Sequence, residues 1–195
     1  MAVGFAVAGG RSRRMGRDKA LLAWGESTLL DHTIARLHQA CEAVRILTGR
    51  EARYADRGLP VDADVIPGTG PLGGLYTGLL GLTSGALGLF LAVDLPWVPV
   101  SLLQALPGLA EGFDVVVPAW GRGPEPLCAV YRRSCLDPVF RRLQAGELRM
   151  TSFWSEVRVR RVGEAELLPY GDPAVFLRNL NTLEEYERST ARSAR

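Results

Sequence analysis

The sequence predicts an α/β sandwich with a mainly parallel sheet. Short apolar runs alternate along the chain with segments whose apolar residues recur every three or four positions. This alternation of strand and helix is typical of parallel sheets that are covered by helices. A length of 195 residues suits one domain with a full hydrophobic core. We therefore expect a single domain over residues 1–188 and a frayed tail over residues 189–195.

The amino-terminal elements are predicted from apolar runs and one helix cap. Residues 3–8 are an apolar run that glycines end, which predicts a buried strand. A Ser-Thr pair can cap a helix over residues 29–39, whose apolar side chains fall on one face. Residues 43–48 predict a second short strand, and residues 60–63 predict a weaker one.

The middle of the chain carries no charged residue from Val65 to Val93, which is long enough to span a bilayer. Glycines and the turn-like sequence Thr-Ser-Gly divide this segment in two. We therefore expect a buried helix over residues 72–82 and a buried strand over residues 87–93, and no membrane span. An Asp-Leu-Pro turn follows, and then a helix over residues 100–106.

The carboxyl-terminal part predicts three strands and two helices. The strands are expected over residues 113–118, 127–131 and 157–162, and a helix over residues 135–144. The last helix is expected over residues 182–189, with Asn181 or Thr182 as its cap and carboxylates in its first turn.

Composition excludes several classes of protein. The net charge is only +2, which argues against bulk binding to nucleic acid. Three cysteines without a C-x-x-C pair and two histidines give no zinc pattern. We interpret the cysteines as reduced and mostly buried, which favours a cytoplasmic protein.

A basic loop follows the first strand. Four arginines and Lys19 place five positive charges within residues 11–19, directly after Gly9 and Gly10. The glycines let backbone amides approach a ligand closely, and the charges suit a triphosphate and its leaving pyrophosphate. The alternative is a solvated basic loop. Asp18 is interpreted as a local cap or ion-pair partner and not as a metal ligand.

The segment from Val7 to Leu22, which reads VAGGRSRRMGRDKALL, resembles the signature of the nucleotidyltransferase superfamily. The resemblance implies a three-layer α/β/α sandwich, Rossmann-like, with the mixed but mainly parallel sheet of nucleotide-diphospho-sugar transferases. It also implies that backbone at Val7, Ala8, Gly9 and Gly10 holds the nucleotide. Lys19 and Arg14 would then act on the phosphates.

A single carboxylate, Asp94, ends the strand predicted over residues 87–93. Magnesium is typically held by one or two carboxylates together with substrate phosphates and water. Ligands of open α/β sheets bind at the carboxyl ends of the strands, where Asp94 lies. We therefore expect Asp94 to bind Mg²⁺ and the nucleotide, with a plain turn residue as the alternative. The Asp-x-Pro pattern also resembles the metal-binding motif of the superfamily.

Residues before and within the uncharged segment are candidates for reading the base. Gly70-Pro71-Leu72-Gly73-Gly74 resembles the family's G-P-L-x-G loop, so Gly73 is a nucleotide-binding candidate; helix packing is the alternative. Guanine needs hydrogen-bond acceptors, and of Asp62 and Asp64 the second is the better match to the family's nucleotide-contacting aspartate. A surface-loop residue is the alternative for Asp64.

The carboxyl-terminal half resembles the molybdenum-cofactor guanylyltransferases, the MobA family. The matching segments are PLCAVY at residues 126–131, AGELR at residues 145–149 and NLNTLEE at residues 179–185. The resemblance implies that Arg149, Asn179 and Asn181 contact molybdopterin. A solvated arginine and a helix cap are the respective alternatives.

The resemblance covers residues 3–187 and implies transfer of GMP from GTP to the phosphate of molybdopterin, with release of pyrophosphate. The alternatives are a molybdopterin cytidylyltransferase, a sugar- or alcohol-phosphate nucleotidyltransferase of the same fold, or a nucleotide-binding adaptor without catalysis. Proteins that deliver molybdopterin and chaperones of molybdenum enzymes are implied partners, and we expect a monomer. The decisive geometric expectation is that the basic loop and Asp94 converge on one triphosphate.

Overall fold

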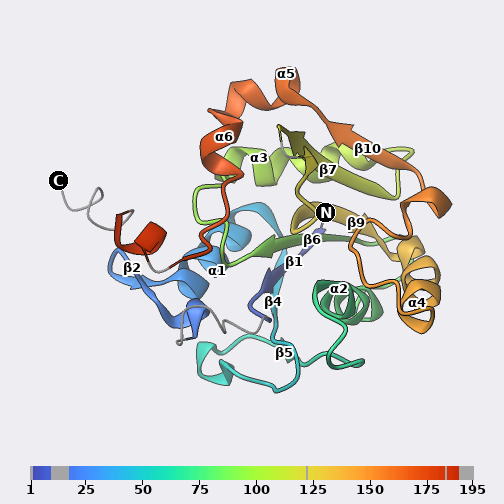
Figure 1. Cartoon of the computed structure of the whole chain (residues 1–195), viewed down its shortest axis with the longest axis horizontal. Helices are drawn as coiled ribbons and strands as arrows, with labels where there is room; N and C mark the ends of the chain where they lie inside the picture. Colours follow the sequence, from blue (N-terminus) through green and yellow to red (C-terminus); the bar gives the residue numbers. More distant parts are fainter. Residues whose placement is uncertain (1, 10–17, 122, 183, 189–195) are drawn as a thin grey trace.

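The computed structural model describes residues 2–9, 18–121, 123–182 and 184–188 (Figure 1). A mixed sheet runs through the middle of the molecule in the order β10-β7-β9-β6-β1-β4-β5. Its strands are β1 (Ala2–Val7), β4 (Ala43–Leu47), β5 (Val61–Asp62), β6 (Leu87–Ala92), β7 (Val115–Trp120), β9 (Cys128–Arg132) and β10 (Val159–Val162). The expected tail at 189–195 lies outside the described residues.

Along this strand order, only β9 runs against the others; the two-residue strand off the order, residues 123–124, is also antiparallel to β7. β1 pairs in parallel with β4 and β6, and β10 pairs in parallel with β7. β9 is antiparallel to both of its neighbours, β6 and β7. The chain returns from β7 to β9 through the short β8 (Gly123–Pro124), and a short connection of this kind permits only antiparallel pairing. The prediction of a mainly parallel mixed sheet is confirmed.

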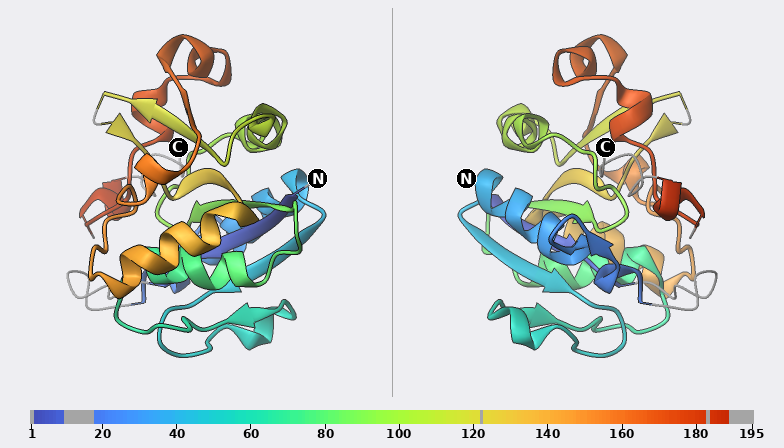
Figure 2. Two further views of the ribbon diagram at one scale, coloured as in Figure 1. Left: turned by 90° about the vertical axis from the view of Figure 1, so that its right-hand side faces the viewer. Right: turned by 90° about the vertical axis from the view of Figure 1, so that its left-hand side faces the viewer.

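Helices cover both faces of the sheet, as the prediction of three layers requires. α1 (Leu29–Ala40) packs with α3 (Val100–Ala105), while α2 (Pro71–Leu80) packs with α4 (Leu136–Gln144) on the opposite face (Figures 1 and 2).

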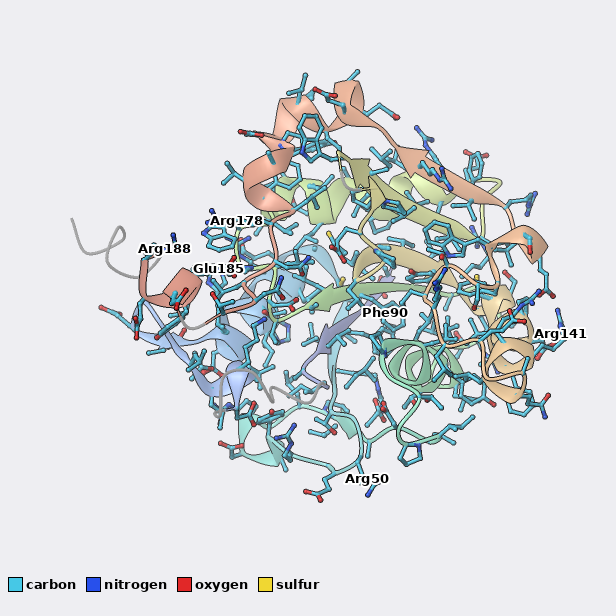
Figure 3. All side chains as sticks on the ribbon, viewed as in Figure 1. Arg50, Phe90, Arg141, Arg178, Glu185 and Arg188 are labelled. Atoms are coloured by element: carbon cyan, nitrogen blue, oxygen red, sulfur yellow. The ribbon has the colours of Figure 1, made fainter. Side chains whose placement is uncertain are left out.

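The register of side chains places each helix on its own face. A Cβ at Gly4 of β1 would lie 3.2 Å from Leu37 Cβ of α1, whereas a Cβ at Gly78 of α2 would lie 2.7 Å from the Phe90 ring of β6. Phe90 stacks on Phe5 of β1 with ring centroids 4.6 Å apart, and Figure 3 shows Phe90 beside α2. Glycine at position 78 therefore lets α2 lie directly on the aromatic surface of the sheet.

The uncharged segment is divided as the glycines predict. It forms α2, a turn and β6, and Leu72, Leu75 and Leu79 of α2 are buried in the core. Within the described part of the chain, no helix is both long enough and apolar enough to cross a membrane.

Helix caps and cysteines follow the prediction. Thr28 caps α1 in a reciprocal capping box with Asp31. Residues 184–188 are helical, and Thr182 Oγ1 accepts a hydrogen bond from Glu185 N at 3.1 Å, so Thr182 is the cap. The three cysteines are free, with Cys128 and Cys135 buried and Cys41 half-buried.

Several short elements were not predicted, because they are too short to show a periodic pattern of apolar residues. They are β8, the hairpin of β2 (Ala23–Trp24) and β3 (Ser27–Thr28), and the single-turn helices α5 (Glu164–Leu167) and α6 (Pro173–Phe176). A two-residue strand has no alternation to read, and a four-residue helix has no second turn. Strand β7 also begins at Val115 and not at residue 113, because Phe113 N closes a turn onto Ala110 O.

Candidate functional site

The candidate site lies where β1, β4 and β6 end together. Val7 is in register with Leu47 of β4 and Ala92 of β6. Beyond the strands, Ala8 N donates to Leu47 O at 2.8 Å and Val93 N donates to Val7 O at 3.2 Å. The chain therefore leaves β1 and β6 side by side, which brings Gly9 and Asp94 to the same edge of the sheet.

Lys19 and Asp94 meet at this edge. Lys19 Nζ lies 3.1 Å from Asp94 Oδ2, and the two side chains are 13% and 26% exposed. The other oxygen, Asp94 Oδ1, is buried and accepts no hydrogen bond from any described residue. The expected convergence of the basic loop with the carboxylate thus holds for Lys19; Gly10 and Arg14 lie outside the described residues.

Asp18 holds the start of the short helix that carries Lys19, η1 (Lys19–Leu21). Its Oδ1 accepts from Ala20 N at 3.2 Å, as an N-cap. Its Oδ2 accepts from Tyr54 Oη at 2.8 Å and from Arg53 Nη1 at 2.8 Å. The interpretation of Asp18 as a local cap and ion-pair partner is confirmed.

A second carboxylate, Asp64, lies beside Gly49, which packs against Gly9. Asp64 N donates to Gly49 O at 2.6 Å, and a Cβ at Gly9 would lie 2.9 Å from Gly49 N. A Cβ at Gly74, in the first turns of α2, would lie 3.6 Å from Asp64 Oδ1. Asp64 is half-buried, and burial raises the pKa of its carboxyl. Gly49 and Gly74 therefore flank this acidic group, and Gly49 packs in turn against Gly9.

Two neighbours of Asp64 have structural contacts. Asp62 forms a bidentate ion pair with Arg45, with N–O distances of 2.7 and 2.6 Å, which ties β5 to β4. Gly73 is buried, and a Cβ there would contact the Thr69 side chain and lie 3.1 Å from Ile66 O. This packing alone requires a glycine at position 73, so the helix-packing alternative explains the residue without a ligand.

We call the set of Ala8, Gly9, Asp18, Lys19 and Asp64 the β1 side of the site. The opposite side, which we call the β9 side, consists of Glu125, Asn179 and Leu180, with Asp94 between the two. Sequence reasoning missed Glu125, which precedes β9.

Glu125 is fixed by two hydrogen bonds. Its Oε2 accepts from Asn179 Nδ2 at 3.0 Å, and its Oε1 accepts from Leu127 N at 3.3 Å. Because Leu127 O accepts from Ala92 N at 2.8 Å, this stretch runs alongside the end of β6 that leads to Asp94. Burial raises the pKa of Glu125, and the negative charge of Asp94 raises it further.

The carboxyl-terminal segment passes across both carboxylates. Leu180 is buried, and its N donates to Asp94 O at 2.8 Å directly after the Asn179 contact with Glu125. The segment continues beside β2, where Tyr186 Oη donates to Ala23 O at 2.6 Å (Figure 1). The Arg178 guanidinium lies 4.4 Å from the centre of the Trp97 ring, on the left of Figure 3.

The remaining predicted site residues are more exposed. Asn181 is exposed, and its backbone N donates to Glu185 Oε2 at 2.7 Å as part of the last helix cap. Arg149 is exposed in the turn after α4, and among the described residues its side chain forms no hydrogen bond or ion pair with either side of the site. Of the three candidates in the carboxyl-terminal half, Asn179 is the one whose side chain bonds to the β9 side, through Glu125.

Solved structures share this fold. Molybdopterin-guanine dinucleotide biosynthesis protein A from Archaeoglobus fulgidus superposes with a TM-score of 0.84 at 21% identity, covering 100% of this chain and 99% of that one. The 4-diphosphocytidyl-2C-methyl-D-erythritol synthase of Anaerococcus prevotii gives a TM-score of 0.69 at 11% identity, covering 100% and 98%. At these identities the likeness concerns the fold.

Curated relatives extend the likeness to the sequence. A probable molybdenum cofactor guanylyltransferase from Pelotomaculum thermopropionicum is 36% identical over 181 residues, which is 93% of this chain and 88% of the relative. A molybdenum cofactor guanylyltransferase from Desulfosudis oleivorans is 31% identical over 191 residues, or 96% and 94%.

The fold, the relatives and the strand-end site define a nucleotidyltransferase. More narrowly, the chain belongs to the family of the MobA-like NTP transferase domain, which it matches over residues 4–159. The expected family and enzyme class are thereby confirmed.

Proposed function

We propose that this enzyme transfers GMP from GTP to the phosphate of molybdopterin, giving the guanine dinucleotide cofactor and pyrophosphate. The observation that carries the proposal is the approach of Lys19 Nζ to within 3.1 Å of Asp94, at the sheet edge where nucleotides bind. The names of the curated relatives, molybdenum cofactor guanylyltransferases, support the choice of substrates.

The β1 side would bind GTP. Backbone at Val7, Ala8, Gly9 and Gly10 would hold the base and ribose. A side chain at Gly9 would collide with Gly49, so this position requires glycine. Lys19 and Arg14 would bind the phosphates, where positive charge stabilises the departing pyrophosphate. In this state the Lys19 ammonium is shared between Asp94 and a phosphate oxygen.

Asp64 is proposed to select guanine. Guanine presents an N1–H and an N2 amino group, both of which are donors, and Asp64 offers two acceptor oxygens beside Gly49 and Gly74. Cytosine presents a donor and acceptors instead, so a carboxylate at this place favours GTP over CTP. Gly73 would act indirectly, by letting the start of α2 pack closely beside Asp64.

Asp94 fits the role of a magnesium ligand. Its Oδ1 is buried without a hydrogen-bond donor from the described residues, so it can face a cation while Oδ2 faces Lys19. In the described part of the chain no three acidic, histidine or cysteine side chains gather as a complete metal cage. Substrate phosphates and water would complete the shell, which is usual for Mg²⁺. When bound, Mg²⁺ supplies neutralisation of the charge on the reacting phosphates.

The β9 side would receive molybdopterin. Asn179 is held in place by its hydrogen bond to Glu125, and it would contact the reacting phosphate. Arg149 and Asn181 are exposed and accessible to a second substrate. No covalent enzyme intermediate is required, because the phosphate of molybdopterin is itself the nucleophile; the chain orients two substrates and stabilises charge.

Two measurements test the proposal. Calorimetric titration with GTP, CTP, UTP and ATP in Mg²⁺ is expected to give the tightest binding with GTP. Incubation with GTP and molybdopterin is expected to release pyrophosphate in proportion to dinucleotide formed. Tightest binding of CTP would identify a cytidylyltransferase, and binding without pyrophosphate release would indicate an adaptor without catalysis.

A further inference from the structure

Tyr54 has an unusual backbone conformation. Its φ is +69°, and it is the only non-glycine residue with a positive φ in the described part of the chain. A bulky side chain in the left-handed region is strained, and such strain persists only where the surroundings enforce it. Strained residues of this kind concentrate at functional sites, so the contacts of Tyr54 indicate what the strain maintains.

The strained conformation points two adjacent side chains at one oxygen. Tyr54 Oη donates to Asp18 Oδ2 at 2.8 Å, and Arg53 Nη1 donates to the same oxygen at 2.8 Å. Successive residues in extended backbone point in opposite directions. The left-handed turn at Tyr54 instead brings both donors to Asp18, and the Arg53 guanidinium lies 5.1 Å from the Tyr54 ring.

The environment of Tyr54 keeps this contact in place. Tyr54 is only 7% exposed, and burial together with the nearby Asp18 carboxylate raises the pKa of its phenol. The hydroxyl therefore remains a donor throughout the physiological pH range. Its segment follows β4, far in sequence from Asp18, so the contact connects that segment to the part of the β1 side that carries Lys19.

Asp18 connects Tyr54 to Lys19, the next residue in the chain. One carboxylate oxygen is held by Tyr54 and Arg53, and the other caps Ala20 N, so Lys19 lies between two fixed neighbours. Lys19 Nζ in turn reaches Asp94 at 3.1 Å. A small rotation of the backbone at Asp18 would swing the long Lys19 side chain away from that position.

We propose that Tyr54 is a positioning residue: acting through Asp18, it holds Lys19 where its ammonium meets the triphosphate. This inference rests on the proposed function, in which Lys19 binds the phosphates of the nucleotide. A purely structural role for Tyr54, anchoring the segment after β4 to the core, predicts the same contacts but different behaviour when Lys19 is absent.

A double-mutant cycle separates the two roles. The affinity for GTP in Mg²⁺ is measured by calorimetry for the wild type, Tyr54→Phe, Lys19→Met and the double variant. We expect Tyr54→Phe to weaken binding about 5- to 10-fold, because only part of the free energy of the lost hydrogen bond is passed to the nucleotide through Lys19. In the Lys19→Met background, the same change is expected to alter the affinity less than 2-fold, because the group that it positions is gone.

Two further variants protect the test against a folding defect. Arg53→Met removes the second donor to Asp18 from a side chain that is 40% exposed, so the fold tolerates it; we expect a 2- to 3-fold loss that also disappears with Lys19→Met. Tyr170→Phe, which removes a phenol from the short helix η6 (Leu168–Tyr170), a helix with no residue on either side of the site, is the matched control and should bind GTP normally. Thermal melting of every variant accompanies the titrations.

Each outcome decides one question. An equal loss from Tyr54→Phe with and without Lys19, or no loss in a folded Tyr54→Phe, overturns the inference and leaves the proposed function standing. Unchanged GTP binding by Lys19→Met overturns the phosphate role of Lys19 itself. If CTP binds more tightly than GTP, the guanylyl assignment fails, and the cycle repeated with CTP still tests Tyr54.

Discussion

The two sides of the site are built in different ways. The β1 side consists of residues that directly follow parallel strands or lie in the loop after the first one, and packed glycines bring them together. The β9 side depends on an antiparallel strand and on a carboxyl-terminal segment that crosses it, with Asn179 bound to Glu125. Asp94 contacts both, through Lys19 on one side and Leu180 on the other.

This difference suggests a division of labour that mutations can test. The β1 side carries Lys19 and packs against Gly49 and Gly74, features that suit a nucleotide with its phosphates. The β9 side offers a carboxylate and an amide near Asp94. If each side serves one substrate, changes on one side should leave binding of the other substrate intact.

The largest effect is expected at Asp94, which the two sides share. Asp94→Ala should lower kcat/KM by at least about 10²–10³-fold, because it removes the carboxylate that we propose holds Mg²⁺ at the reacting phosphates. The fold should survive, since the hydrogen bond from Leu180 is to the backbone oxygen of Asp94. Pyrophosphate release and thermal melting check both points. Normal turnover by Asp94→Ala would refute this role, and Glu111→Ala, at an exposed carboxylate, is the control.

Asp64 should affect only the nucleotide. Asp64→Asn is expected to weaken GTP binding about 10-fold, because one acceptor becomes a donor facing guanine. The KM for molybdopterin should stay within about 2-fold of the wild-type value if the sides are independent. Calorimetry with GTP and steady-state kinetics with molybdopterin measure the two quantities. Equal losses for both substrates would contradict the division.

Glu125 should show the opposite pattern. Glu125→Ala leaves the Asn179 amide without its acceptor and should raise the KM for molybdopterin about 3- to 10-fold, with GTP affinity unchanged. Glu125→Gln retains an acceptor oxygen and should restore most of the loss. If Glu125→Ala instead changes the GTP affinity and leaves the KM for molybdopterin unchanged, Glu125 serves the nucleotide and not molybdopterin.

The pH dependence of stability provides a separate test of Glu125. Its folded-state pKa is raised by burial and by Asp94, so ionising it opposes folding. That destabilisation is present above the raised pKa and disappears as the pH falls toward the ordinary value for glutamate. Glu125→Gln should therefore melt at a higher temperature than the wild type at pH 8, and the difference should shrink toward pH 4. A constant difference between pH 4 and pH 8 would indicate that the carboxyl is not perturbed.

The smallest effect is expected from Tyr186→Phe. It removes one hydrogen bond to Ala23 O at the surface, worth at most about 1 kcal/mol, or roughly 2–4 °C in Tm for a protein of this size. If the carboxyl-terminal segment serves only the β9 side, GTP affinity should not change. A parallel loss of GTP affinity would show that the segment also supports η1 through β2.

The sequence predicts the β1 side well because its information is local. An apolar run followed by glycines and charges predicts both a strand and a loop at the strand end, and parallel pairing then brings Lys19 to Asp94. Glu125 could not be found in this way. Its place beside Asp94 depends on the antiparallel pairing of β9 with β6, which apolar periodicity does not reveal.

Tyr54 was missed for a related reason. Nothing in the residues around it specifies a left-handed backbone, which usually falls to glycine or asparagine. The conformation is imposed by tertiary contacts with Asp18, a residue of another segment. Arg149 and Asn181 were found only through resemblance, and their roles remain predictions.

The hydrogen bond from Leu180 to Asp94 has a consequence for synthesis of the protein. A chain emerging from the ribosome can assemble β1, β4 and β6 long before residue 180 is translated. Until then, the turn that carries Asp94 lacks the hydrogen bond from Leu180 N. Truncated products should therefore be incomplete at their reacting centre even when most of the fold has formed. Full activity thus becomes a property of chains that have been translated beyond residue 180.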